Sequence, residues 1–463
     1  MGTLISSLNM ALQSMQAEQE ALSTTTNNIS NVNTPGYSRQ TVSLEEAHPV
    51  QYGGFLFGNG VAVGQITSQR DNLLQTRLGQ ETQQQAKYDS HLGTMQQVQT
   101  LFNETAGNGL QSSITGFFNS LQQLSTSPSD PSLRQGVLSA AQNLAQNFNG
   151  IANNLSQLQQ NADRTVTQSV NQVNNLTSQI ANLNSQISSA TATGQNAGTF
   201  IDQRDQLMNQ LSGLIDVSTI DAGNGAVTLT TSSGAALVVG NQSFQLTAQM
   251  NATTGFQDIY SQGADITSGL SGGSLAGAIQ SRDQTIPSIL SSLDSLASAL
   301  GNSMNSINKS GTDLNGNAGG NFFTVPSSGS AGAASTISVA IANPSKIAAS
   351  LNGSVGDNSN INAMLAVQNQ SIVNGQTPLS AYSNLVYQVG SDVSTAQSES
   401  TSAQAMVLQL QNQIGSVSGV SINEESVNLI QFERAYQAAA QVASVIDKLT
   451  ATAINLGQGT TAS

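Results

Sequence analysis

The sequence predicts a mainly α fold with an inserted β domain, built as an elongated multi-domain rod in which long helices from both termini pair as a coiled coil. Apolar residues recur at alternating steps of three and four near both ends of the chain, which is the spacing of a coiled-coil seam. A central stretch carries short β-rich runs separated by glycines. The length of 463 residues suits about three domains.

The first predicted element is a coiled-coil helix over residues 1–35. Ile5 and Leu12 widen its apolar stripe, which favours burial on more than one side. An ordinary amphipathic core helix is the alternative interpretation. The residues assigned to the seam are Leu4, Leu8, Met15, Leu22 and Ile29.

A hinge is predicted after this helix, because the asparagine-rich segment runs into a Pro-Gly turn dipeptide that cannot continue a helix. Residues 49–64 interleave aromatic and glycine positions and are expected to be extended or looped. The residues assigned to the hinge are Asn31, Asn33, Thr34, Pro35, Gly36 and Tyr37.

The middle of the chain is predicted as a helical rod interrupted by a β insertion. Residues 36–215 form the first part of the rod, and residues 170–187 within it have the apolar spacing of a long polar helix. Residues 216–270 form the inserted β domain, because β-branched residues there alternate with glycine-containing turns. Residues 271–323 return to helical spacing and form the second part of the rod.

Residues 324–348 are predicted as a short β and linker return of the outer domain. Within it, the Gly/Ser/Ala tract 327–335 has the composition of a flexible linker, and the β-like stretch 336–342 is expected to pack with the β insertion. Residues 349–421 form the third part of the rod, with a Ser/Gly break over 415–421.

The last predicted element is a coiled-coil helix over residues 422–463, with Asn423 as its N-cap before two glutamates. We expect its seam to pack against the seam of the first helix and to form the assembly interface. The residues assigned to this seam are Leu429, Phe432, Tyr436, Val442, Ile446 and Leu449.

Composition excludes several function classes. Twelve Lys and Arg against 26 Asp and Glu give a net charge of −14, which argues against nucleic acid and membrane surfaces as partners. Cys is absent and His occurs only twice, so thiol chemistry and most metal sites are unavailable. Because neutral polar side chains dominate, we predict no catalytic, cofactor or metal site. No apolar run long enough to span a bilayer and no signal peptide is found, so we predict no membrane insertion.

The residues that most resemble catalytic or metal-binding groups favour structural roles. The close carboxylates Asp202/Asp205 and Glu424/Glu425 lack a nearby apolar pocket or second catalytic group, so capping or structural ion pairs are the preferred interpretation. The segment from Asp313 begins like a calcium loop but lacks the required glycine and glutamate at later positions. His48 and His91 stand alone, and a surface or loop position is expected for both.

Five segments together carry a family resemblance. The run Ala21 to Gln40, which includes Asn-Thr-Pro-Gly-Tyr, closely resembles the opening signature of bacterial flagellar rod, hook and hook-associated proteins. Four further segments narrow the resemblance to the hook-associated proteins of the hook–filament junction. These segments are Asp130 to Gln135, Ile201 to Leu207, Gly311 to Phe323 and Ser418 to Leu449.

The resemblance implies a secreted, extracellular, non-enzymatic subunit of the flagellum, exported unfolded through the type III channel. It implies four partners: hook protein, a second hook-associated protein on the filament side, copies of the chain itself in a ring, and a cytosolic export chaperone that binds the C-terminal helix. It also implies that the two terminal helices pair into an inner coiled coil. Two alternatives stay open: another axial subunit, such as a hook, rod or flagellin-like protein, or a flagellum-mounted extracellular adhesin or enzyme.

Overall fold

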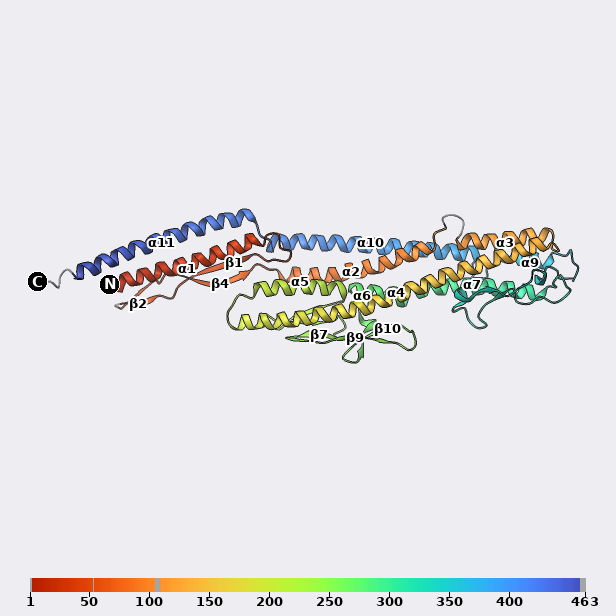
Figure 1. The fold of residues 1–463 in the computed structure, drawn as a ribbon, viewed down its shortest axis with the longest axis horizontal. Coiled ribbons are helices and arrows are strands. Elements are labelled where there is room, and N and C mark those ends of the chain that lie inside the picture. Colours follow the sequence, from red (N-terminus) through yellow and green to blue (C-terminus); the bar gives the residue numbers. More distant parts are fainter. Residues whose placement is uncertain (1, 53, 105–108, 459–463) are drawn as a thin grey trace.

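The protein is an elongated, mainly helical rod, and α1 (Gly2–Ser30) and α11 (Ile422–Gln458) lie side by side at one end of it (Figure 1). The structure is a computed structural model that describes residues 2–52, 54–104 and 109–458. Residue 1 and residues 459–463, the predicted outer limits of the terminal helices, lie outside the described residues. The predicted mainly α, elongated fold with long terminal helices and an inserted β region is confirmed.

A β hairpin completes this end of the rod. The strands β1 (Gln40–Glu46) and β4 (Val61–Ser68) pair antiparallel and run beside α1, and the short strands β2 (Val50–Tyr52) and β3 (Phe55–Phe57) continue the hairpin. Residues 49–64, expected to be extended or looped, hold β2, β3 and the start of β4, whereas residues 40–46 form β1 although the sequence places them in the helical rod. We call α1, α11 and β1–β4 the terminal domain.

The rod is built from long helices. The longest is α4 (Pro131–Ala192), whose 62 residues span about 90 Å at 1.5 Å per residue. It starts sharply, because Asp130 accepts hydrogen bonds from the backbone N–H groups of Ser132 and Leu133, and proline occupies the first turn. The other rod helices are α2 (Asn72–Leu101), α3 (Leu110–Thr126), α5 (Gly198–Leu214), α6 (Gly273–Gln280), α7 (Ile286–Ser310), α9 (Ser359–Ala366) and α10 (Pro378–Ser418).

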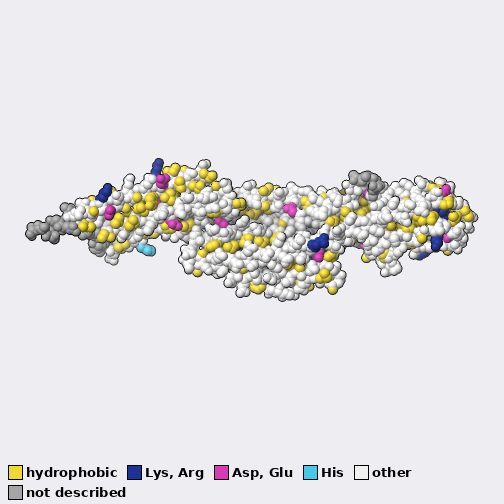
Figure 2. All heavy atoms as spheres, viewed as in Figure 1, with side chains coloured by type: hydrophobic (Ala, Val, Ile, Leu, Met, Phe, Trp, Pro, Cys, Tyr) yellow, Lys and Arg dark blue, Asp and Glu magenta, His cyan; other side chains and the backbone are white. Residues whose placement is uncertain are grey.

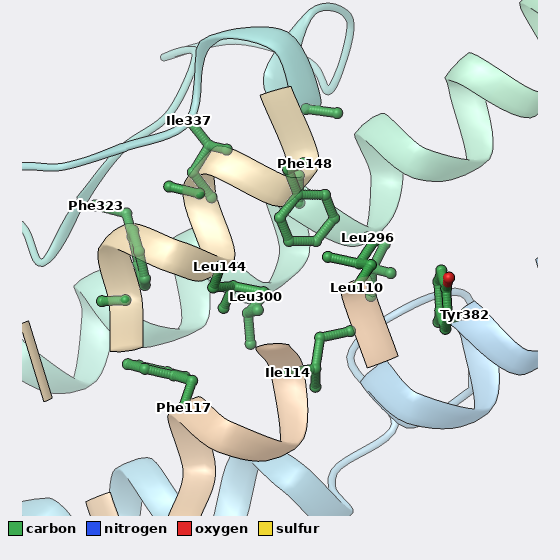
Figure 3. Close-up of a cluster of buried hydrophobic side chains, with 14 of the residues drawn as sticks. Leu110, Ile114, Phe117, Leu144, Phe148, Leu296, Leu300, Phe323, Ile337 and Tyr382 are labelled. Carbon is green, nitrogen blue, oxygen red and sulfur yellow. The ribbon is translucent and has the colours of Figure 1, made fainter. Parts of the chain in front are cut away.

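The far end of the rod holds the first of two main hydrophobic cores. Helices α3, α4 and α7 meet there with the segment around Phe323, and their buried side chains interlock (Figure 3). The rings of Phe322 and Phe323 each lie 5.8 Å from the ring of Phe117 in an edge-on arrangement, which aromatic pairs favour. This end therefore has a closely packed interior of its own.

The second core joins the middle of the rod to the inserted β region, whose presence confirms the prediction. We call residues 216–270 the β module. Its antiparallel sheets have the orders β5-β6-β7-β8 and β11-β10-β9, and it packs on one side of α4 (Figure 1). The strands are β5 (Ser218–Asp221), β6 (Val227–Thr230), β7 (Ala236–Val239), β8 (Gln242–Ser243), β9 (Leu246–Met250), β10 (Gln257–Ser261) and β11 (Ala264–Asp265).

Two predictions about residues 324–348 are wrong. The tract read as a flexible linker contains α8 (Ala333–Thr336), whose first two alanines are fully buried in the first core. The β-like stretch that follows contains β13 (Ser338–Val339), which pairs with β12 (Phe323–Thr324) and not with the β module. Burial of alanine and isoleucine side chains in the core determines the structure of this segment, despite its local Gly/Ser composition.

The C-terminal break is shorter than predicted. Helix α10 continues through Ser418, so only residues 419–421 separate it from α11. Helix α11 begins at Ile422, and the hydroxyl and carbonyl of Ser421 accept hydrogen bonds from the N–H groups of Glu424 and Glu425. Ser421, and not Asn423, is therefore the N-cap.

Candidate assembly interface

The terminal helices carry a continuous apolar surface. All five residues predicted for the α1 seam are partly buried, as are Leu429, Phe432 and Tyr436 of α11, and Ile446 is buried. Val442 and Leu449 are each 52% exposed, so they lie outside this seam in the single subunit. The structure thus brings the two predicted helices together but assigns two of the predicted residues to another face.

The outer face of α11 is also apolar. Val442 and Leu449 share it with Val427, Ile430 and Val445, which are likewise at least half exposed. Figure 2 shows that apolar side chains gather over this end of the molecule, whereas much of the rod surface in that view is polar and uncharged. Because both its seam face and its outer face are apolar, we expect α11 to be covered by neighbours on more than one side.

The segment predicted as a hinge is a hydrogen-bonded corner. The backbone N–H groups of Thr34 and Tyr37 donate to the carbonyls of Asn31 and Thr34, and Asn31 reaches back to Asn27 on α1. Gly36 has a φ of +80°, a left-handed conformation that glycine adopts without strain. Asn33, Thr34, Pro35 and Gly36 are exposed, so the corner presents a polar rim to its surroundings.

Asn28 is the centre of a buried polar cluster that joins both terminal helices. Its Nδ2 donates to the Gln40 carbonyl at 2.8 Å and to Glu425 Oε2 at 3.1 Å. Its Oδ1 accepts from the Tyr37 hydroxyl at 2.8 Å and from the Gln40 N–H at 2.9 Å. Asn28 is only 1% exposed and uses all four of its hydrogen-bonding positions, so its removal would leave several buried groups without partners.

Glu425 is the charged member of the same cluster. It is 2% exposed, and its Oε1 accepts from Arg39 Nε at 2.7 Å, while Arg39 also contacts the exposed Glu424 at 3.0 Å. The Arg39 N–H donates to the Ser418 carbonyl at the end of α10. We call Asn28, Tyr37, Arg39, Gln40 and Glu425 the terminal clamp. Burial, with the nearby carboxylates of Asp202 and Glu425, raises the pKa of Tyr37 to about 12.

A second cluster fastens the corner to the rod. Asp202 on α5 accepts from the Ser38 hydroxyl at 2.7 Å and from Arg70 Nη2 at 2.6 Å. Arg70 Nη2 also donates to the Gly198 carbonyl at 2.7 Å. A Cβ atom at Gly198 would lie 2.6 Å from Ser68 Oγ, so a larger residue would have to displace the Ser68 side chain where α5 meets the hairpin. We call Ser38, Arg70, Gly198 and Asp202 the rod clamp.

The acidic member of each clamp was singled out from the sequence. The two acidic pairs are structural, as interpreted: Asp202 and Glu425 form the ion pairs just described, and Asp205 lies 3.7 Å from Arg204. Their partners Asn28, Arg39 and Arg70 were missed, because they are 132 to 397 residues away in the sequence. The scarcity of charge was the available signal for these contacts. Because the chain has only 12 basic residues, each arginine could have been examined for a structural ion-pair role.

Neither histidine joins a site. His48 is exposed, as expected, but His91 is buried on α2 and shares a 2.9 Å hydrogen bond with Ser281, so its predicted surface position is wrong. In the described ranges, no three His, Cys, Asp or Glu side chains are grouped so that they could hold a metal ion. Of the helices in the described part of the chain, none combines the length and apolarity needed to cross a membrane.

Comparison with known families gives consistent matches along the chain. Residues 95–323 match the family described as "Flagellar hook-associated protein FlgK helical domain". Residues 8–37 match "Flagella basal body rod protein", and residues 411–456 match "Flagellar basal body rod FlgEFG protein C-terminal". The last two matches cover most of the paired helices α1 and α11.

Individual proteins are similar over nearly the whole chain. Flagellar hook-associated protein 1 of Bacillus subtilis is 29% identical over 97% of this chain and 97% of its own length. The protein of the same name from Salmonella typhimurium is 28% identical over 97% of this chain and 99% of its own. The solved flagellar hook junction protein FlgK from Burkholderia pseudomallei covers 75% of this chain and 100% of its own, with a TM-score of 0.66 and 22% identity. The chain is therefore similar over nearly its whole length to flagellar hook-associated proteins, and its middle matches the helical domain of that family.

Proposed function

We propose that the chain is a structural, non-enzymatic subunit of the bacterial flagellum that forms the junction between hook and filament. It acts outside the cell, after export, by packing its terminal helices against those of neighbouring subunits. The single observation that carries the proposal is the apolar outer face of α11, paired with α1 at one end of a polar rod, in a chain similar to flagellar hook-associated proteins.

The exposed apolar side chains support assembly through this end. Val427, Ile430, Val442, Val445 and Leu449 lose their contact with water only when another surface covers them. Burial of apolar area contributes about 25 cal/mol per Å², so a ring of subunits gains stability by covering this face on every member. The polar, weakly charged rod surface adds hydrogen bonds between neighbours without the cost of desolvating ions.

The proposed partners follow from this position. Hook protein lies on one side, a second hook-associated protein lies on the filament side, and copies of the chain complete the ring. Before export, a cytosolic chaperone covers α11, because the same apolar face would favour aggregation of the free subunit. The mainly helical middle of the chain argues against a hook subunit, for which a mainly β middle is expected.

Genetic complementation tests the proposal. Cells that lack the chain should keep intact hooks but carry no filaments, and the full-length chain should restore filament growth. A chain without residues 1–30, or without residues 430–463, should keep a folded, soluble rod by circular dichroism yet fail to restore filaments. Restoration of filaments by either truncated chain, or filament growth in cells without the chain, would overturn the proposal.

A further inference from the structure

The interior of the rod is divided by a polar level. The first hydrophobic core draws its buried members from residues 95–155 and 286–389, and the second draws them from residues 166–279. Neither core takes a side chain from residues 159–165 of α4 or from residues 280–285, where α6 passes into α7. Two apolar interiors thus meet at one cross-section of the rod.

Arg282 occupies this cross-section. Its side chain is 1% exposed, and its Nη1 donates to Asp163 Oδ1 on α4 at 2.6 Å and to the Gln257 carbonyl on β10 at 2.7 Å. Its Nε donates to Asp283, and its guanidinium lies 5.5 Å from the centre of the Phe256 ring. One buried cation therefore ties α4, the β module and the α6–α7 helix together.

Neighbouring polar groups bridge the same helices. Asp163 Oδ1 also accepts from the Gln257 N–H at 2.8 Å, and Gln159 Nε2 donates to the Arg282 carbonyl at 2.8 Å. Ser281 Oγ forms a 2.9 Å hydrogen bond with Nδ1 of His91 on α2. We call His91, Gln159, Asp163, Ser281 and Arg282 the polar layer.

The backbone also changes at this level. Residues Ser281–Thr285 form a π-helical segment inside an otherwise continuous helix from Gly273 to Ser310. A π-helical turn is a rare, costly feature that inserts a residue and rotates the side chains after it. Here the turn contains Arg282 and Ser281, the two groups that reach α4 and α2.

Apolar contacts alone fix the axial position of long helices poorly, because a slip of one turn exchanges one apolar contact for another. Polar contacts between helices behave differently, since a slip would separate Arg282 from Asp163 and from the Gln257 carbonyl and leave it only Asp283, its neighbour on the same helix. We propose that the polar layer fixes the axial register of the rod helices relative to one another. In this role Asp163 and Arg282 are positioning residues that hold α4 and the α6–α7 helix in one axial register, and so fix where the β module lies.

The natural absence of cysteine makes the test direct. Cysteines at the exposed positions Ser185 on α4 and Ser291 on α7 carry nitroxide labels in the full chain, and double electron–electron resonance gives the distance distribution between them. In the Asp163→Leu/Arg282→Met variant we expect retained helicity but a broadened distribution, or a second population displaced by about 5 Å, one helical turn. The Arg204→Met/Asp205→Leu variant removes an ion pair outside the layer and should keep a single narrow distribution.

A second variant covers the case in which the double variant does not fold. Asp163→Asn keeps the side-chain shape and removes only the charge that faces Arg282, and it should broaden the distribution to a smaller extent. A single narrow distance, equal to that of the labelled wild-type chain, in a folded layer variant would overturn the proposal. Equal broadening in the control variant would overturn it too, because any lost ion pair would then have the same effect.

Discussion

Asn28 Nδ2 lies 3.1 Å from Glu425 Oε2, although 397 residues separate them in the sequence. This hydrogen bond joins the last turn of α1 to the first turn of α11, and both side chains are almost completely buried. The two terminal helices are therefore connected by a specific polar contact at the base of the terminal domain, in addition to their apolar seam.

Replacing Asn28 by alanine should loosen the whole terminal domain. The change leaves the Glu425 carboxylate, the Tyr37 hydroxyl and the Gln40 backbone short of partners, and each unsatisfied buried group costs about 1–3 kcal/mol. Hydrogen exchange should show faster amide exchange in α1 and α11 and unchanged protection in α4. Asn33→Ala, at an exposed position of the same corner, is the control, and equal protection in both variants would contradict the role assigned to Asn28.

Asp202→Asn and Asp205→Asn should differ, although the two aspartates lie one turn apart on α5. Asp202 forms a 2.6 Å pair with Arg70, and both side chains are 11% exposed, so losing its charge should cost about 3–5 kcal/mol of unfolding free energy. Burial raises the pKa of Asp205, whose arginine partner is 3.7 Å away, so its neutralisation should leave stability unchanged or slightly higher. Urea unfolding of the two variants measures the difference, and equal losses would be inconsistent with the rod clamp.

Glu18→Gln should stabilise the terminal domain above acidic pH. One carboxylate oxygen of Glu18 is buried without a hydrogen-bond partner among the described residues, and burial raises the pKa of this group above its usual value. Ionisation therefore opposes folding, and the wild-type domain should lose stability as pH rises from the unfolded-state pKa through the raised folded-state pKa. Hydrogen exchange of α1 in both proteins, from about pH 4 to about pH 7, should show this relative loss in the wild type only. A relative gain in the wild type would contradict the prediction.

Val445→Glu should block assembly without unfolding the subunit. Val445 is 56% exposed on the outer face of α11, and surface substitutions of this kind change stability by about 0.5 kcal/mol or less. A charge at that position should nevertheless prevent a neighbour from covering the apolar face, so filament growth should be lost while thermal unfolding stays unchanged. Ser444→Glu, at the preceding exposed position, adds the same charge about 100° around the helix from Val445 and is expected to retain most function.

Periodic patterns made the helices predictable, because a helix that packs on one side repeats its apolar residues locally. Spacing alone therefore revealed α1, α11 and the part of α4 over residues 170–187, and the mainly helical fold with them. The seam residues stay a prediction for the assembled flagellum. The hairpin of β1 and β4 was placed in the rod, since neither its pairing nor its position beside α1 leaves a signal in the local sequence.

Long-range polar contacts were beyond sequence reasoning for a physical reason: a hydrogen bond requires a geometry that only the folded chain supplies. Arg134 shows this clearly. It belongs to one of the segments that resemble the family, and it is 1% exposed, with its guanidinium donating to the carbonyls of Pro128 at 2.5 Å and Ile347 at 2.8 Å. Its acceptors are backbone atoms, which every residue has, so no side-chain pattern could identify them.

The contact between Asn28 and Glu425 also leads us to expect a particular order of folding events. Local contacts form quickly, whereas closing a loop of nearly four hundred residues carries a large entropic cost. The helical rod brings α1 and α11 together and removes most of that cost, so the terminal domain should be the last part of the subunit to fold. A subunit that folds in this order completes its rod first and the apolar surface of its terminal domain last.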